Sequence, residues 1–367
     1  MTRILHYIGS LDFGGSQSFV MELYRKIDRT KLQFDFVVFP NESGGIEDEI
    51  RALGGNIFVC PRYSGKNHFV FCKWWKTFLN EHPEYRVVHG HVRSCASIYL
   101  PIAKRAGLIT IAHSHSTSNG RGTSAVVKAI LQFPIRYIAD HLFSCSDIAG
   151  IWLYGKKATG SPKYKMVPNC VEISRFSYSE RNRSSVREEF NIPKDALVIG
   201  HIGRFHEAKN HERIIKIFAN VLKRHENTRL LLVGDGNLKS NIEQLGKLLG
   251  VYDKIIFTGA QASPSRFYSA MDVFLFPSKW EGLPLSVVEA QAAGLPCFVS
   301  DTVTKDVKLT NLVTYLSLEL SDDEWTNVIL GCIDHQTREI TAQHQEKLLS
   351  FDSLKVAREL QDFYLNL

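Results

Sequence analysis

The sequence has 367 residues, more than one hydrophobic core usually organises, which predicts two domains with a cleft between them. Its 44% hydrophobic and 22% charged residues exclude a disordered or fibrous chain, and no apolar run approaches the roughly 20 residues of a membrane-spanning helix. Residues 1–170 hold 21 Lys and Arg against 12 Asp and Glu, a net charge of +9, whereas the remainder carries −3 and the whole chain +6. A basic half favours an anionic partner such as a phospholipid surface. Nucleic acid is not expected, because zinc-finger spacing and RRM-type aromatic motifs are missing.

Short apolar runs alternate with helical patterns along the chain, which predicts an α/β protein with parallel sheets built from βαβ units. The predicted strands of the first half are Ile4–Ile8, Phe34–Phe39, Asn56–Cys60, Val87–His91, Leu108–Ala112, His141–Cys145 and Lys165–Val167. Those of the second half are Leu197–Ile202, Arg229–Val233, Lys254–Phe257, Val273–Phe276 and Pro296–Val299. The apolar spacing of residues 214–222 predicts a helix, and the polar stretch 174–195 predicts the domain boundary.

A glycine and two cations follow the first strand of the second half. Gly203 allows a ligand to approach the backbone closely, and Arg204 and Lys209 flank the loop before the next helix. Ligands of doubly wound sheets bind beyond the carboxyl ends of the strands, so these cations suit a diphosphate. Taken alone, the loop fits a structural explanation as well as a diphosphate site. In that explanation Lys209 is a solvated loop charge and Arg204 forms an ordinary interdomain salt bridge.

A second loop follows the fourth strand of the second half and leads into a helix that begins at Leu285. Gly282 and Pro284 force the loop, so the first amides of the helix form a second anion site. Carboxylates beside a phosphate need hydrogen-bond donors, which sugar and ribose hydroxyls supply to Glu281 and Glu289. The alternatives are a loop cap for Glu281 and a solvated helix charge for Glu289.

Histidines lie near the ends of two strands of the first half. His113 directly follows the strand Leu108–Ala112 and is expected to face the cleft, with His115 as a competitor two residues on. His89 and His91 form a similar pair that suggests a metal ion. We favour the interpretation of His89, His91 and His115 as loop histidines satisfied by the backbone, and we predict no metal site.

These motifs resemble retaining glycosyltransferase family 4 of the bacterial surface-polysaccharide type. The resemblance rests on Gly203-Arg204 with Lys209 and on Glu281 and Glu289, and it covers nearly the whole chain. Further matches are Val233-Gly234-Asp235-Gly236, Thr258-Gly259, Phe276-Pro277-Ser278, Gly294-Leu295-Pro296 and Pro168-Asn169-Cys170-Val171-Glu172. Cys170 replaces a frequent glycine, and residues 301–309 lack the glycines often found in that loop.

The resemblance implies the GT-B fold, in which two Rossmann-like domains face each other across a cleft. Residues 1–175 would form the acceptor-side domain and residues 176–350 the nucleotide-sugar-binding domain. A helix within residues 351–367 would cross back to the first domain.

The resemblance also implies a role for each motif. Arg204 and Lys209 would bind the donor diphosphate, Glu289 the ribose, and Glu281 and His113 the transferred sugar. The expected catalytic residues are therefore His113, Glu281, Arg204 and Lys209. The expected donor-binding residues are Gly14, Gly15, Gly203, Arg204, Lys209, Gly234, Gly236, Gly282, Leu283, Pro284, Leu285 and Glu289. We expect no metal or other cofactor, because no persuasive Asp-x-Asp cluster occurs.

The implied activity is retaining transfer of a hexose or N-acetylhexosamine from a UDP-sugar to a saccharide or lipid-linked saccharide in surface or capsular polysaccharide biosynthesis. The alternatives are a non-hydrolysing UDP-sugar epimerase and a non-catalytic sugar-nucleotide-binding protein. A dehydrogenase is disfavoured, because no G-x-G-x-x-G follows a first strand. Aromatic residues interleaved with lysines at 66–78, and a similar mixture at 128–137, predict a cytoplasmic protein attached peripherally to the inner face of the membrane. Packing of these segments on the sheet is the structural alternative.

Overall fold

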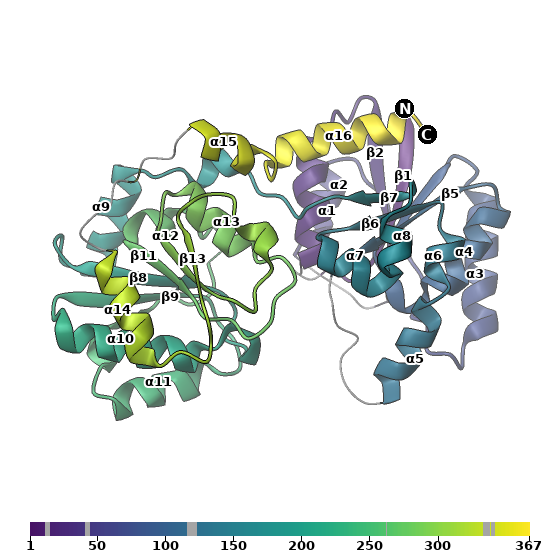
Figure 1. The fold of residues 1–367 in the computed structure, drawn as a ribbon. Helices are drawn as coiled ribbons and strands as arrows, with labels where there is room; N and C mark the ends of the chain where they lie inside the picture. The colour runs from purple at the N-terminus through teal and green to yellow at the C-terminus, as the bar shows by residue number, and fades with distance from the viewer. Residues whose placement is uncertain (12–14, 41–44, 116–122, 262, 333–337, 339–341) are drawn as a thin grey trace. The chain divides into compact units, whose positions relative to one another are not determined.

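The computed structural model describes all residues except 12–14, 41–44, 116–122, 262, 333–337 and 339–341, and it divides into two compact units (Figure 1). Unit 1 comprises Met1–Cys170 and Ser353–Leu367, and unit 2 comprises Val171–Asp352. The chain therefore leaves unit 1 after Cys170 and returns to it for the last helix. The predicted boundaries at 175 and 350 lie a few residues from these positions.

Unit 1 is a seven-stranded parallel sheet in the order β3-β2-β1-β4-β5-β6-β7, with helices on both faces. The strands are β1 (Thr2–Gly9), β2 (Leu32–Val38), β3 (Ile57–Val59), β4 (Val87–Gly90), β5 (Ile109–Ser114), β6 (His141–Ser144) and β7 (Tyr164–Met166). One face packs against α1 (Gly15–Lys26), α2 (Glu47–Ala52) and α16 (Ser353–Leu365). The other packs against α3 (His68–Glu81), α4 (Ala96–Arg105), α6 (Ile135–Ile138) and α7 (Asp147–Tyr154). Elements α5 (Thr123–Gln132), α8 (Lys156–Thr159) and the short 3₁₀ helix η1 (Arg93–Cys95) complete the unit.

Unit 2 is a six-stranded parallel sheet in the order β10-β9-β8-β11-β12-β13. Its strands are β8 (Leu197–Ile202), β9 (Thr228–Val233), β10 (Ile255–Phe257), β11 (Val273–Phe276), β12 (Cys297–Ser300) and β13 (Val313–Leu316). One face packs against α9 (Glu180–Glu189), α12 (Ser265–Ala270), α13 (Leu285–Ala292) and α15 (Ala342–Leu349), and the other against α10 (His211–Arg224), α11 (Lys239–Leu248) and α14 (Asp322–Gly331). Four 3₁₀ helices connect these elements, namely η2 (Ile173–Phe176), η3 (Glu207–Lys209), η4 (Tyr252–Lys254) and η5 (Lys305–Val307).

The predicted α/β class is confirmed, and every predicted strand is present. Strands buried on both faces consist of near-continuous apolar runs, as in β11, where all four residues are fully buried. Helix α10 buries the predicted stripe that contains Ile214, Ile217 and Phe218, and its charged residues Glu212, Lys216, Lys223 and Arg224 are exposed. The sequence pattern missed β13, which pairs with β12 at the edge of the sheet.

Two predictions for unit 1 are wrong in detail. Strand β5 does not end at Ala112 but continues through His113 to Ser114, because both residues pair with β6. Of the aromatic residues of α3 that were expected at a membrane, Phe71, Trp75 and Phe78 lie in the core, whereas Phe69 is exposed. In the part of the chain that the structure describes, no helix is long and apolar enough to span a bilayer.

Candidate functional site

The loops that follow β8 and β11 are tied together at the carboxyl edge of the unit 2 sheet. The amide of Lys279 donates to the carbonyl of Ala208 at 2.8 Å, and Asn210 Nδ2 donates to the carbonyl of Pro277 at 3.1 Å. Asn210 has a left-handed backbone, with φ of 55°, which asparagine tolerates better than most residues. These bonds hold the predicted cationic loop at a fixed distance from the predicted carboxylate loop.

Lys209 and Glu281, one from each loop, form an ion pair with Nζ and Oε1 2.8 Å apart. Both side chains are largely enclosed, with exposed fractions of 18% and 14%, and Nζ also lies 4.7 Å from the centre of the Phe276 ring. The ion pair does not have hydrogen-bond geometry at Oε1, so this oxygen has no directed hydrogen bond from a described residue. A ligand that brings both a phosphate and a hydroxyl group can satisfy both charges separately.

Arg204 directly follows Gly203 and is exposed. Its side chain has no hydrogen-bond or ion-pair partner among the described residues. The backbone beside it is fixed, because the amide of Gly203 donates to the carbonyl of Val233 at 3.0 Å. The guanidinium is therefore an exposed cation on a backbone fixed by hydrogen bonds, which suits an anion arriving from solvent.

Gly234 and Gly236 support this loop from β9 and have no space for a side chain. A Cβ atom on Gly234 would lie 2.1 Å from the carbonyl oxygen of Gly203, and one on Gly236 would lie 2.5 Å from that of Phe205. Their φ angles of 143° and 156° also favour glycine. The structure thus explains both glycines by backbone packing under the cationic loop.

The loop after β11 ends where α13 begins at Leu285. Leu283 and Pro284 are buried and anchor the loop, whereas Gly282 retains some exposure. Pro284 is the N-cap residue of α13 and has no side-chain acceptor for the first amides of the helix. Unpaired amides at a helix N-terminus favour an anion, as the sequence predicted for this position.

Glu289 lies one turn further along α13 and has an unusual environment. Burial raises the pKa of its carboxyl group to about 7, although a hydrogen bond from Tyr268 and the charges of Arg175 and Lys209 oppose this shift. The Tyr268 hydroxyl donates to Oε2 at 2.5 Å. Among the described residues only Oε2 has such a partner, which leaves Oε1 to accept from a ligand hydroxyl. Tyr268 comes from α12 and was not predicted, because nothing in the sequence connects it to α13.

Unit 1 brings five histidines together on one face of three neighbouring strands. His6 of β1 pairs in register with His89 of β4, and His91, His113 and His115 follow on β4 and β5 or just beyond them. Ring nitrogens lie 3.1 Å apart between His6 and His91, 3.1 Å between His89 and His113, and 2.8 Å between His91 and His115. Burial lowers the pKa of each, in the case of His115 to about 3.

The interpretation of His89 and His91 as loop histidines satisfied by the backbone is wrong. Both are buried, and both bond through side chains, His89 additionally to the Tyr364 hydroxyl of α16 at 2.5 Å. His113 is 0% exposed within β5, whereas His115 beyond the strand end is only partly buried. Two partners, His6 and Tyr364, were not predicted.

Of the two glycines before α1 that were predicted to bind the donor, the structure describes one. Gly15 is the first residue of α1 and is exposed, and a Cβ atom there would meet nothing within 4 Å. Gly14 lies outside the described residues.

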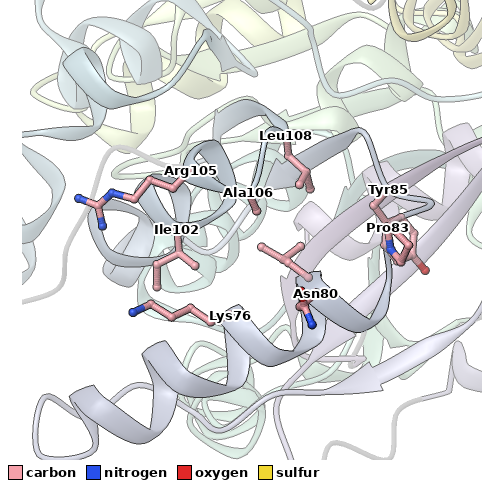
Figure 2. Close-up of a pocket in the computed structure, with 9 residues that line it drawn as sticks. Lys76, Asn80, Pro83, Tyr85, Ile102, Arg105, Ala106 and Leu108 are labelled. Carbon is pink, nitrogen blue, oxygen red and sulfur yellow. The ribbon is translucent and has the colours of Figure 1, made fainter.

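The cavity shown in Figure 2 is not part of this arrangement. It has a volume of about 440 Å³ and lies between α3 and α4, where Lys76, Asn80 and Arg105 are among its lining residues. Tyr85 and Leu108, which also line it, precede β4 and β5 and therefore mark the amino edge of the sheet. Ligands of such sheets bind at the carboxyl edge.

Known proteins are similar to this chain in sequence and in fold. The family model described as "Glycosyl transferases group 1" matches residues 182–319. The putative glycosyltransferase EpsF of Bacillus subtilis is 33% identical over 332 residues, which cover 89% of this chain and 86% of EpsF. The UDP-Gal:alpha-D-GlcNAc-diphosphoundecaprenol alpha-1,3-galactosyltransferase of Escherichia coli is 23% identical, over 91% of this chain and 90% of its own. The structure of HepE from Anabaena in complex with UDP and glucose is similar in fold, with a TM-score of 0.80, 18% identity and complete coverage of both chains.

Proposed function

The chain belongs to the group 1 glycosyl transferases, with the GT-B fold of the family 4 type, and we propose that it acts in the synthesis of cell-surface polysaccharide. From this premise we propose that it transfers a hexose or N-acetylhexosamine from a UDP-sugar, with retention of configuration, to a saccharide or lipid-linked saccharide. Two relatives support this choice of substrates. HepE was solved with UDP and glucose, and the Escherichia coli enzyme is named for UDP-galactose and a diphosphoundecaprenol-linked acceptor.

The observation that carries the proposal is the pairing of cation and carboxylate at adjacent strand ends of unit 2. Lys209 and Glu281 are held 2.8 Å apart, Arg204 of the same loop has no partner among the residues that the structure describes, and the first amides of α13 follow the second loop. A nucleoside diphosphate sugar has the matching groups, because its phosphates suit the cations and amides and its hydroxyls suit the carboxylates. Glu289, with one carboxylate oxygen left to accept a hydrogen bond, is assigned to the ribose.

The chemistry follows from where charge develops during transfer. The sugar becomes oxocarbenium-like as its bond to the diphosphate breaks, and negative charge accumulates on the departing phosphate. Arg204, Lys209 and the first amides of α13 stabilise that charge, so we propose that the reaction needs no metal ion. In the retaining mechanism the acceptor attacks from the face of the leaving group, whose phosphate oxygen accepts the acceptor proton. Glu281 orients the transferred sugar through its hydroxyls.

We assign the histidine contact to the transferred sugar to His115 rather than to His113. His113 is fully buried within β5 and bonds to His89, whereas His115 lies beyond the strand end and keeps part of its surface exposed. We expect His115→Ala to lower kcat/KM for the donor more than His113→Asn does. The opposite order would return the role to His113.

A lipid-linked acceptor would bring the protein to a membrane, and the exposed apolar side chains of α5 and α6 support this proposal. Val126, Val127 and Ile130 of α5 are 56–67% exposed, and Phe133 and Tyr137 continue the apolar surface at 55% and 70%. The guanidinium of Arg136 lies 4.5 Å from the centre of the Phe133 ring, so a cation borders the apolar side chains. We propose that this surface, together with the basic character of residues 1–170, attaches the chain peripherally to the anionic inner face of the cell membrane.

The transfer reaction is tested with the purified full-length chain in EDTA. The donors are UDP-glucose, UDP-galactose, UDP-N-acetylglucosamine and the GDP and ADP analogues, and the acceptors are a diphosphate-lipid-linked monosaccharide and free saccharides. We expect acceptor-dependent release of UDP from one donor and a product with the anomeric configuration of that donor. Isomerised donor without acceptor would indicate an epimerase, and nucleotide binding without turnover on any acceptor would indicate a binding protein.

Variants then test the assigned roles. Glu281→Ala should lower kcat about 100-fold and change the Kd for UDP little, because its contacts are to the sugar. Lys209→Ala should lower kcat and should also raise the Kd for UDP, because its contact is to the diphosphate. Lys279→Ala is the matched control. This lysine also lies on the two loops, but its side chain is 42% exposed and its Nζ makes a loose ion pair with Glu207 at 3.8 Å, so it is not expected to bind the diphosphate. Equal effects of the two lysine variants would contradict the diphosphate assignment.

A further inference from the structure

We propose that His91, His113 and His115 of unit 1 form a binding site for a borderline divalent metal ion such as Zn²⁺. One ring nitrogen from each of the three residues lies within 4.8 Å of those of the other two. The three side chains come from the ends of the adjacent strands β4 and β5, so the sheet itself fixes their backbone positions.

The candidate ligand atoms already converge. His91 Nδ1 and His115 Nε2 are 2.8 Å apart, and His113 Nε2 is buried without a hydrogen-bond partner among the described residues. Tetrahedral zinc with bonds of about 2.0–2.1 Å places its ligand nitrogens roughly 3.3 Å from one another. Small rotations of the imidazole rings are enough to reach this spacing, and the metal would replace the proton that His91 and His115 share.

The remaining ring nitrogen is held by a neighbour in two of the three ligands. His91 Nε2 is 3.1 Å from His6 Nδ1, and His113 Nδ1 is 3.1 Å from His89 Nε2. His115 Nδ1 is buried and has no hydrogen-bond partner among the described residues. Metal-binding histidines almost always have their second nitrogen fixed in this way, which sets the orientation and the tautomer of each ring. A cluster of histidines packed only for their bulk has no need of this pattern.

The chemistry of the ligand set selects the class of metal. Three imidazoles suit Zn²⁺, Ni²⁺, Co²⁺ and Cu²⁺, whereas Mg²⁺ and Ca²⁺ prefer oxygen ligands. His115 is the most exposed of the three, which leaves the fourth coordination position for a water molecule or an anionic oxygen. A second group, His6, His89 and His91, also has three nitrogens within 4.8 Å, but all three residues are buried and offer no opening for a fourth ligand.

The site has a consequence that rests on the proposed function. Because His115 is assigned to the transferred sugar, a metal ion on this residue removes that contact. Zinc should therefore inhibit the transfer reaction and should raise the KM for the donor, although the reaction itself proceeds in EDTA.

The test uses the full-length chain after removal of metals with EDTA. Titration with Co²⁺ should produce the intense visible absorption of a tetrahedral nitrogen site at one equivalent, and Zn²⁺ should displace the Co²⁺. His115→Ala, at the least buried ligand, should lower the affinity for Zn²⁺ at least 10-fold. His82→Ala is the matched control, because His82 is a surface histidine of unit 1 whose Nδ1 lies 2.9 Å from Glu84 and could bind zinc adventitiously.

The outcomes separate the site from its consequence. Weak octahedral Co²⁺ absorption, unchanged zinc affinity in His115→Ala, or loss of binding in His82→Ala would each overturn the metal site. The Co²⁺ spectrum of the unmodified chain decides the question even where a variant fails to fold. Tight zinc binding at His115 without inhibition would leave the metal site intact and would contradict the sugar contact that we assign to this residue.

Discussion

The hydrogen bond from Tyr268 to Glu289 allows a quantitative test of the ribose site. Burial raises the pKa of Glu289 to about 7, and the Tyr268 hydroxyl opposes that shift by donating to the ionised carboxylate at 2.5 Å. Tyr268→Phe removes only this hydroxyl, and the aromatic ring stays in the core of unit 2. The pKa of Glu289 should therefore rise further, and the carboxyl group should become largely protonated at pH 7.

The size of the effect follows from the strength of the bond. A hydrogen bond to a charged group contributes about 1.5–3 kcal/mol, and one pKa unit corresponds to about 1.4 kcal/mol, so the pKa should rise by about 1–2 units. At pH 7 the ionised fraction would fall from about one half to between about one tenth and one hundredth. If ribose hydroxyls bind only the carboxylate, the Kd for UDP rises about 5- to 50-fold.

Calorimetric titration with UDP at pH 7 and pH 9 measures this directly. At pH 9 the carboxyl group is mostly ionised in wild type and at least half ionised in the variant, so the two affinities should agree within about twofold. Tyr315→Phe is the control, because Tyr315 donates to the backbone carbonyl of Thr304 rather than to a carboxylate. A Tyr268→Phe defect of the same size at both pH values would refute the protonation argument.

Three further predictions concern stability and the membrane. Gly234→Ala should lower the free energy of unfolding, measured by urea titration, by about 3 kcal/mol and should weaken UDP binding, because its Cβ atom would clash with the carbonyl of Gly203. Gly15→Ala is the control and should unfold like the wild type, since a Cβ atom there meets nothing within 4 Å. Ile130→Glu should reduce co-sedimentation with anionic vesicles several-fold, and Phe69→Glu on α3 should not. Equal binding of wild type to neutral and anionic vesicles would contradict membrane attachment. Glu289→Gln should raise the Tm at pH 8 more than at pH 5. The pKa of the wild-type Glu289 carboxyl group is about 7 in the folded chain against an ordinary value of 4.5. As the pH rises from 5 to 8, the free energy of unfolding of the wild type therefore falls by on the order of 2 kcal/mol, and the glutamine variant does not show this fall.

The sheets could be predicted from the sequence because their strands are buried on both faces and are therefore continuously apolar. The predicted bounds of β8 and β11 match those of the structure. The end of β5 could not be predicted, because His113 and Ser114 are polar and belong to the strand only through their pairing with β6. Strand β13 was missed for a similar reason, since two of its four residues are only partly buried.

The candidate site could be predicted where its residues are close in sequence. Gly203, Arg204 and Lys209 lie in one loop, and Glu281 is separated from the start of α13 by a few residues. Contacts between distant segments gave no such signal. Tyr268 reaches Glu289 from another helix, and His6 meets His91 across two strands that are far apart in the chain. Such pairs become visible only when the register of the sheet and the packing of its helices are known.

Helix α16 makes the order of synthesis matter for unit 1. All seven strands of that unit precede residue 171, but α16 supplies Val356, Ala357, Leu360 and Tyr364 to the core beneath α1. Unit 2 is one continuous stretch of the chain, Val171–Asp352. The apolar face of unit 1 that α16 covers stays exposed until this helix has left the ribosome, so a nascent chain stalled before α16 should be the species that chaperones bind and proteases remove.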